Sequence, residues 1–116
     1  MKLKKYQDMV MINLIEPMIS FMEDLGDCDY TADDINRCKD LIFNYLDALD
    51  DMATPSDTLI MEQVESLVLA LNELNEEFDF IETMEREAIW EIIQNSAIEY
   101  GLSEYDDDIT GQWREW

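Results

Sequence analysis

Apolar residues recur at three- and four-residue intervals along most of the chain, which is the periodicity of amphipathic α-helices. Apart from a short run at 78–81, no stretch has the alternation and β-branched content of a strand. The pattern predicts an all-α fold: a compact bundle of about four helices, followed by a short acidic tail that contains tryptophan. The predicted helices run from Leu3 to Leu25, from Thr31 to Met52, from Thr54 past Leu74, and from Asp79 or Thr83 to Tyr100.

Residues with known preferences for helix ends bound these segments. Thr31, followed by acidic residues, predicts an N-cap, and Thr54 before Pro55 predicts a cap with proline in the first helical position. Gly26 has the position of a C′ glycine. Pro17 falls inside the first helix, so we expect it to kink or divide that helix.

The first helix is apolar on nearly every side between Met9 and Met22. Such a helix is typically central in a bundle or buried against a partner, so a homodimer is one expectation for this chain. Its methionines are expected to fill the core. We expect the bundle to occupy residues 1–101 as one domain and the tail to occupy 102–116.

The charge of the chain changes this picture. Asp and Glu number 29 against 7 Lys and Arg, which gives a formal net charge of −22. Strongly acidic chains are often disordered, but 47% of these residues are hydrophobic, which is enough to build a core. Solubility needs a net charge of only about 2 to 8 in a small domain. The excess repulsion is destabilising, and a positively charged partner would compensate for it.

Most catalytic and metal-binding arrangements are excluded by composition. The chain has no histidine, which removes Ser-His and Cys-His pairs and His-containing metal sites. It has no glycine-rich phosphate loop. Cys28 and Cys38 lack metal-ligand spacing. We expect two reduced thiols, and a disulfide that joins them across ten residues is the alternative. We therefore expect no enzyme activity, no catalytic residue, no cofactor and no metal.

One enzymatic alternative remains open. Glu62 and Glu65, with Glu76 and Asp79, resemble the paired ExxE and ExxD elements of the all-α, Mg²⁺-dependent nucleotide pyrophosphohydrolases. That resemblance implies a metal held by carboxylates from facing helices.

The start of the chain does not have the features of a signal peptide, and no stretch is long and apolar enough for a membrane span. The expected location is therefore the cytoplasm, with no contact to a membrane.

The net charge of −22 disfavours direct binding to nucleic acid, which is itself negatively charged. The few basic residues are concentrated at Lys2, Lys4 and Lys5 and form no patch.

Two parts of the chain are candidates for binding a basic partner. Asp33, Asp40 and Asp47 lie one heptad apart, about 10.5 Å along a helix, and Asp51 continues the row. Such a row can meet the basic residues of a nucleic-acid-binding groove. The tail adds a second acidic run and two tryptophans, which either cap the bundle or anchor a partner. The tail residues are Asp106, Asp107, Asp108, Trp113 and Trp116.

In size, composition and helical content the chain resembles small acidic inhibitors carried by phages and plasmids. These are the DNA-mimicking anti-restriction proteins and the anti-CRISPR proteins that block Cas9-type effectors. Its ending, 108–116, also looks like the DITxxWREW ending of small mobile-element proteins. The resemblance implies a stoichiometric inhibitor of a basic nucleic-acid-binding protein, a defence nuclease. The alternative is an immunity protein or antitoxin that neutralises one basic toxin.

Overall fold

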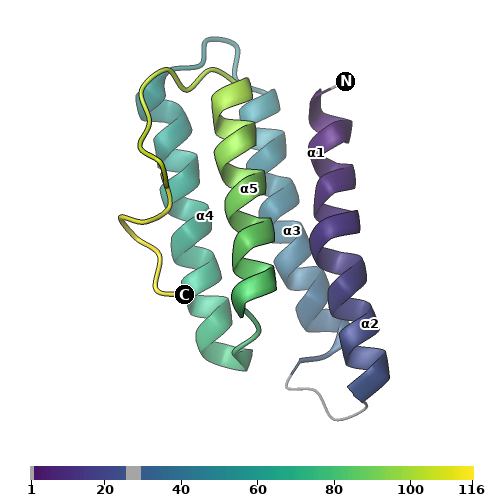
Figure 1. The fold of residues 1–116 in the computed structure, drawn as a ribbon. Helices are drawn as coiled ribbons and strands as arrows, with labels where there is room; N and C mark the ends of the chain where they lie inside the picture. The colour runs from purple at the N-terminus through teal and green to yellow at the C-terminus, as the bar shows by residue number, and fades with distance from the viewer. Residues whose placement is uncertain (1, 26–29) are drawn as a thin grey trace.

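The computed structural model describes residues 2–25 and 30–116 (Figure 1). The described residues form helices and loops, without a strand, and the all-α prediction is confirmed. The elements are α1 (Lys2–Val10), the π-helix η1 (Met11–Ile15), α2 (Glu16–Leu25), α3 (Ala32–Asp50), α4 (Asp57–Phe78) and α5 (Thr83–Glu99). α1, η1 and α2 run on as one rod, so the described part is a bundle of four rods.

The rods alternate in direction, and the bundle is elongated, with extents of 45 × 29 × 20 Å. α3 packs between α1 and α4, and α5 contacts α1 on one side and α4 on the other. This arrangement leaves an outer seam where α3 and α4 lie side by side. The tail descends over α4 and α5 on another side (Figure 1).

The first rod is continuous but contains a π-helical turn just before Pro17, the residue at which the sequence predicted a kink or a division. The N–H of Glu16 donates to the carbonyl of Met11, one residue further back than in an α-helix. The extra residue rotates the chain so that Leu14 and Ile15, which are adjacent in sequence, both enter the core. Pro17 follows at once, where its missing N–H and its ring are incompatible with a regular α-helix.

α3 begins as predicted. Thr31 Oγ1 accepts from the N–H of Asp34 at 3.3 Å, and the Asp34 carboxylate accepts from the N–H of Thr31 at 3.0 Å, which is a reciprocal capping box. Gly26, the predicted C′ residue of the first helix, lies outside the described residues.

The predicted start of α4 is wrong by two residues. Ser56, not Thr54, is the N-cap, and its hydroxyl accepts from the N–H of Leu59 at 3.2 Å. Pro55 therefore precedes the helix. Of the two starts considered for α5, the structure has the later one, with Glu82 as its N-cap. Asp79 instead ends α4 with a φ of 44°.

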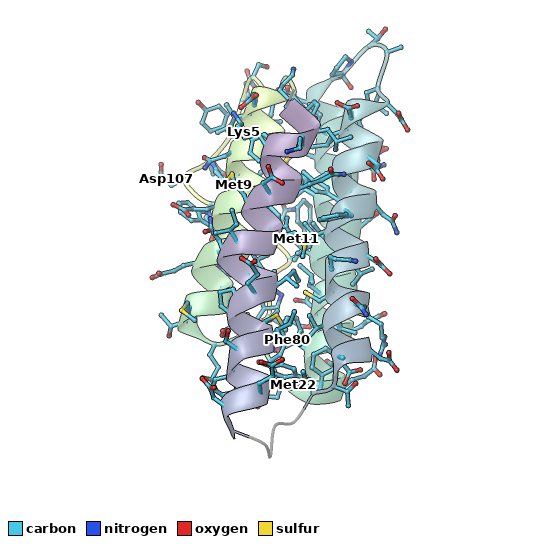
Figure 2. The ribbon with its side chains drawn as sticks, turned by 90° about the vertical axis from the view of Figure 1, so that its right-hand side faces the viewer. Lys5, Met9, Met11, Met22, Phe80 and Asp107 are labelled. Carbon is cyan, nitrogen blue, oxygen red and sulfur yellow. The ribbon has the colours of Figure 1, made fainter. Side chains whose placement is uncertain are left out.

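The apolar stripes of all four rods meet in one core, and its fully buried members include Leu14, Ile42, Leu71 and Ile93. The methionines of the first rod contribute to it: Met18 is buried, and Met9, Met11 and Met22 pack against it, partly buried (Figure 2).

The tail continues the same core. At the end of α5, Gly101 has a φ of 127°, and Leu102 N–H donates to the carbonyl of Ala97 at 2.9 Å, which is a Schellman motif. Leu102 and Ile109 are both buried. Two side-chain amides, one on α5 and one on α4, hydrogen-bond to the backbone of the tail. Gln94 bonds the backbone of Asp106 and Ile109, and Asn72 bonds that of Trp113 and Glu115.

Candidate protein-binding surface

The outer seam between α3 and α4 contains a shallow groove of about 340 Å³, which we call the α3–α4 groove. Its walls and floor are Arg37, Asp40, Leu41 and Asn44 from α3 and Ala70, Glu73, Leu74 and Glu77 from α4. A smaller hollow of about 160 Å³ adjoins it and shares Leu41, Asn44 and Ala70. The other residues that line this hollow are Tyr45, Gln63, Ser66 and Leu67. The combined surface has an apolar floor, with carboxylates at one end and neutral polar groups at the other.

Helical geometry places the predicted acidic row on the exposed face of α3. Asp33, Asp40 and Asp47 are exposed on that helix, on the side opposite the stripe that enters the core, and Asp51 is exposed at the C-cap. Residues one heptad apart fall on one helix face, since two turns take about seven residues. Of this row, Asp40 lines the α3–α4 groove.

A cation that was not predicted from the sequence lies within this row. Arg37 donates two hydrogen bonds to the Glu77 carboxylate, at 2.7 and 3.2 Å, and lies 3.4 Å from Asp34. The hydrogen bonds from Arg37 hold the pKa of the Glu77 carboxyl below its ordinary value. Arg37 sits between Asp33 and Asp40 at four- and three-residue steps, and that spacing could have identified it.

α4 also contributes two carboxylates that were not predicted from the sequence. Glu73 and Glu77 line the groove opposite α3. Leu59 and Leu69 are 43% and 46% exposed on the same helix. Glu73 and Glu77 are four residues apart and lie outside the apolar stripe of α4, which is the signal that could have revealed them.

The tail acids lie elsewhere. Asp107 is on the side of the bundle away from α3 (Figure 2). Asp108 is already paired, with Arg114 at 3.0 Å, and it accepts from the N–H of Thr110 at 2.9 Å. The structure thus separates the predicted acidic residues into an α3 row and a distant tail group.

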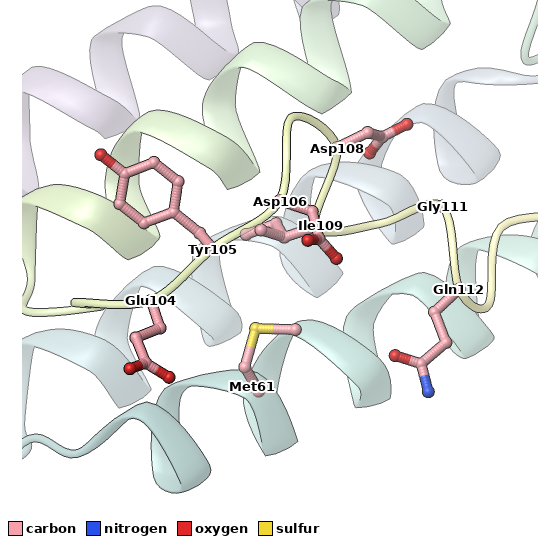
Figure 3. Close-up of a pocket in the computed structure, with 8 residues that line it drawn as sticks. All are labelled: Met61, Glu104, Tyr105, Asp106, Asp108, Ile109, Gly111 and Gln112. Atoms are coloured by element: carbon pink, nitrogen blue, oxygen red, sulfur yellow. The ribbon is translucent and has the colours of Figure 1, made fainter.

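A second pocket, of about 690 Å³, lies between the tail and α4 (Figure 3). It contains Glu104, Asp106 and Asp108, with Met61 of α4 beneath the tail. Within the described part of the chain, no group of acidic or cysteine side chains has an arrangement that could hold a metal ion.

The two tail tryptophans, Trp113 and Trp116, are partly buried and pack against the core. The Arg114 guanidinium lies 5.4 Å from the ring of Trp116. Both rings therefore have contacts within the chain, and their role as partner anchors stays a prediction.

The carboxylates of the enzymatic alternative are not brought together across helices. Glu62, Glu65 and Glu76 are all on α4, and Asp79 is its C-cap. The two pairs are separated by about 20 Å along one helix at 1.5 Å per residue. This arrangement differs from the facing helices that the pyrophosphohydrolase resemblance implies.

No protein-family model, no curated protein and no solved structure matches this chain.

The basic residues of α1 are engaged by the protein itself. Lys4 pairs with Asp8 at 3.5 Å, and Lys5 pairs with Glu99, which also accepts from the Tyr6 hydroxyl at 2.7 Å. These contacts hold the pKa of Glu99 below its ordinary value, the hydrogen bond from Lys5 having the largest effect. Lys5 thus lies on the α1–α5 side, away from the α3–α4 groove, and Lys4 is paired within α1.

The remaining expectations concern the cysteines, the homodimer and the membrane. Burial raises the pKa of the Cys38 thiol to about 12, which makes it unreactive at neutral pH, while Cys28 lies outside the described residues. Ile12 and Ile19 remain 62% and 36% exposed on the first rod, and the homodimer stays a prediction. Among the described helices, none combines the length and apolar character needed to cross a membrane.

Proposed function

We propose that this chain is a stoichiometric inhibitor that binds a basic nucleic-acid-binding protein through the α3–α4 groove and the acidic row beside it. The observation that carries the proposal is the composition of this surface. Asp40 lines the groove on the α3 side and Glu73 and Glu77 line it on the α4 side, while Arg37 is the one cation among the described residues that line it. Asp33 and Asp47 are exposed on the same face of α3 as Asp40. Exposed carboxylates held on rigid helices keep their spacing when a partner approaches.

A bacterial defence nuclease of the Cas9 type is the best candidate target. Such effectors hold nucleic acid in a positively charged channel and read a short flanking motif with arginines. An acidic surface seated in that channel excludes the nucleic acid, and carboxylates pair with arginine through two parallel hydrogen bonds. Inhibition therefore needs neither a cofactor nor a reaction.

Exposed apolar side chains on α4 favour a second candidate function. Leu59 and Leu69 can form desolvated contacts that pure charge mimicry would not need. Contacts of this kind fit an immunity protein or antitoxin that neutralises one cognate basic toxin. The two candidates share the surface and differ in the partner.

Order of addition in a DNA-cleavage assay tests the leading proposal. A purified Cas9-type effector with its guide is mixed with the chain either before or after the target DNA. We expect cleavage to stop at one equivalent when the chain is added first and to continue when DNA already occupies the channel. Polyglutamate of matched charge is the control for unspecific repulsion.

Cleavage that continues at large molar excess, for Cas9-type and restriction nucleases alike, would contradict the nuclease proposal. Stoichiometric protection of cells or of substrate against a small basic toxin would then assign the chain to the second function.

A further inference from the structure

The α3–α4 groove combines an apolar floor with an acidic rim at one end. Leu41, Ala70 and Leu74 supply the floor, and Asp40 and Glu73 lie at the rim. A groove between two antiparallel helices runs along both of them, so a third helix can lie in it and insert side chains at three- and four-residue steps. The groove can therefore take an amphipathic helical segment of a partner.

The acidic end already holds one guanidinium group. Arg37 Nη1 and Nη2 donate to the two carboxylate oxygens of Glu77, at 3.2 and 2.7 Å. This two-pronged geometry is available to arginine and not to lysine, whose ammonium is a point charge. The rim of the groove thus already contains one carboxylate that binds a planar guanidinium group.

Two further carboxylates at this end have no such partner. Neither Asp40 nor Glu73 forms an ion pair with another residue in the part of the chain that the structure describes, although both line the groove with Arg37 and Glu77. The neighbouring hollow differs from the groove because its polar lining residues, Gln63, Ser66 and Asn44, carry no charge. Unpaired negative charge is therefore concentrated at one end.

We propose that the α3–α4 groove binds an arginine-bearing amphipathic helix of the partner protein, with the arginine between Asp40 and Glu73 and the apolar side chains on Leu41, Ala70 and Leu74. This inference rests on the proposed function and names the element of the partner that is recognised. Arg37 acts as an internal competitor, since it holds Glu77 and adds positive charge at the point where the partner's arginine arrives.

A synthetic helical peptide of leucine and arginine is the probe. Amide chemical shifts of the ¹⁵N-labelled chain are followed during titration, with a second peptide in which citrulline, a neutral isostere, replaces arginine. We expect the largest shifts at 37–44 and 66–77 and a much weaker response to the citrulline peptide. Equal shifts on α5 and the tail, or an equal response to citrulline, would overturn the proposal.

Matched variants separate the groove from net charge. Asp40→Asn with Glu73→Gln removes two charges from the groove, and Glu87→Gln with Glu91→Gln removes two exposed charges from α5. We expect the first pair to weaken peptide binding about tenfold, equivalent to about 1.4 kcal/mol, and the second to have much less effect. Equal losses from the two pairs would refute a specific groove.

Arg37→Gln provides a readout that a purely structural role for Arg37 would not produce. This change frees Glu77 and should tighten binding of the arginine peptide, whereas weaker binding would contradict the competitor role.

Failure of this inference is distinct from failure of the proposed function. A nuclease inhibited equally by the wild-type and Asp40→Asn/Glu73→Gln chains leaves nuclease inhibition standing and refutes recognition of an arginine-bearing helix by the groove. Peptide binding in the groove without inhibition of any nuclease leaves the groove standing without the function.

Discussion

Asp79 holds a backbone conformation that its side chain disfavours. It ends α4 with φ 44° and ψ 57°, in the left-handed region, where its N–H donates to the carbonyl of Asn75 at 2.8 Å. Non-glycine residues in this region carry a strain of about 1 kcal/mol, which aspartate only partly avoids. We expect Asp79→Gly to raise the free energy of unfolding by up to about 1 kcal/mol, measured by urea denaturation. Asp79→Ala is the control, because it keeps the strain; a lower midpoint for the glycine variant would contradict the argument.

Asp57 ties the start of α4 to the tail. Its carboxylate accepts from the N–H and hydroxyl of Ser103, at 2.8 and 2.9 Å, and from the N–H of Glu104 at 3.1 Å. These hydrogen bonds, the one from the Ser103 backbone first, hold the pKa of Asp57 below its ordinary value. A carboxylate whose pKa is lower in the folded state stabilises the fold above its unfolded pKa of about 3.9 and loses that contribution as pH falls through the folded pKa.

The corresponding test compares Asp57→Asn with the wild-type chain at several pH values. We expect the variant to be less stable at pH 7 and the difference in unfolding midpoint to shrink as the pH falls below about 4. Asp107→Asn is the control, since Asp107 is exposed and its change should leave no such pH-dependent gap. A gap for Asp57→Asn that is constant with pH would show that these hydrogen bonds do not depend on the charge.

The same contacts explain which helix ends could be predicted. Thr31 and Asp34 satisfy each other within one turn, so the start of α3 is visible in the local sequence. The start of α4 offers caps at both Thr54 and Ser56. The choice is fixed by Asp57 binding residues 103 and 104, which are distant in the sequence. Local sequence could not supply that information.

Within the first rod, the π-helical turn reconciles an apolar sequence with a proline. We expect Pro17→Ala to raise the unfolding midpoint, because proline costs about 3 kcal/mol in a helix interior and alanine restores a backbone donor. The gain should be smaller than that figure, since η1 has already relieved part of the conflict. Burial of both Leu14 and Ile15 should preserve the π turn in the variant, which backbone chemical shifts can report. A lower midpoint would show that the rigidity of proline itself stabilises the rod.

The acidic row on α3 illustrates what periodicity can and cannot reveal about a site. Heptad spacing puts Asp33, Asp40 and Asp47 on one face of a helix, and all three are exposed on α3. It gave no indication that Glu77, on another helix, would hold Arg37 inside the row. The groove exists only because α3 and α4 pack side by side, and the register between two helices is a tertiary property.

For the whole molecule, charge affects folding and binding in opposite directions. A net charge of −22 on a chain with a radius of gyration of 14.0 Å places carboxylates within reach of one another's fields. Salt screens this repulsion, since the Debye length falls from about 10 Å at 0.1 M to about 3 Å at 1 M. We expect the thermal midpoint to rise with added sodium or potassium chloride. A falling midpoint would mean that ion pairs such as Arg37 with Glu77 outweigh the repulsion.

Binding should respond to salt with the opposite sign, and its location can be tested by reversing charge on one side at a time. Attraction between an acidic surface and a basic groove weakens when it is screened, so affinity for the target should fall as salt rises. Asp33→Lys, Asp40→Lys and Asp47→Lys together should abolish inhibition and cost more than any one of them, because the field of the row is collective. The matched triple Glu87→Lys, Glu91→Lys and Asp107→Lys changes the net charge equally on α5 and the tail, and should leave most of the inhibition intact. If both triples weaken inhibition equally, total charge rather than the α3–α4 surface determines binding; if only the second does, the partner binds the opposite side of the bundle.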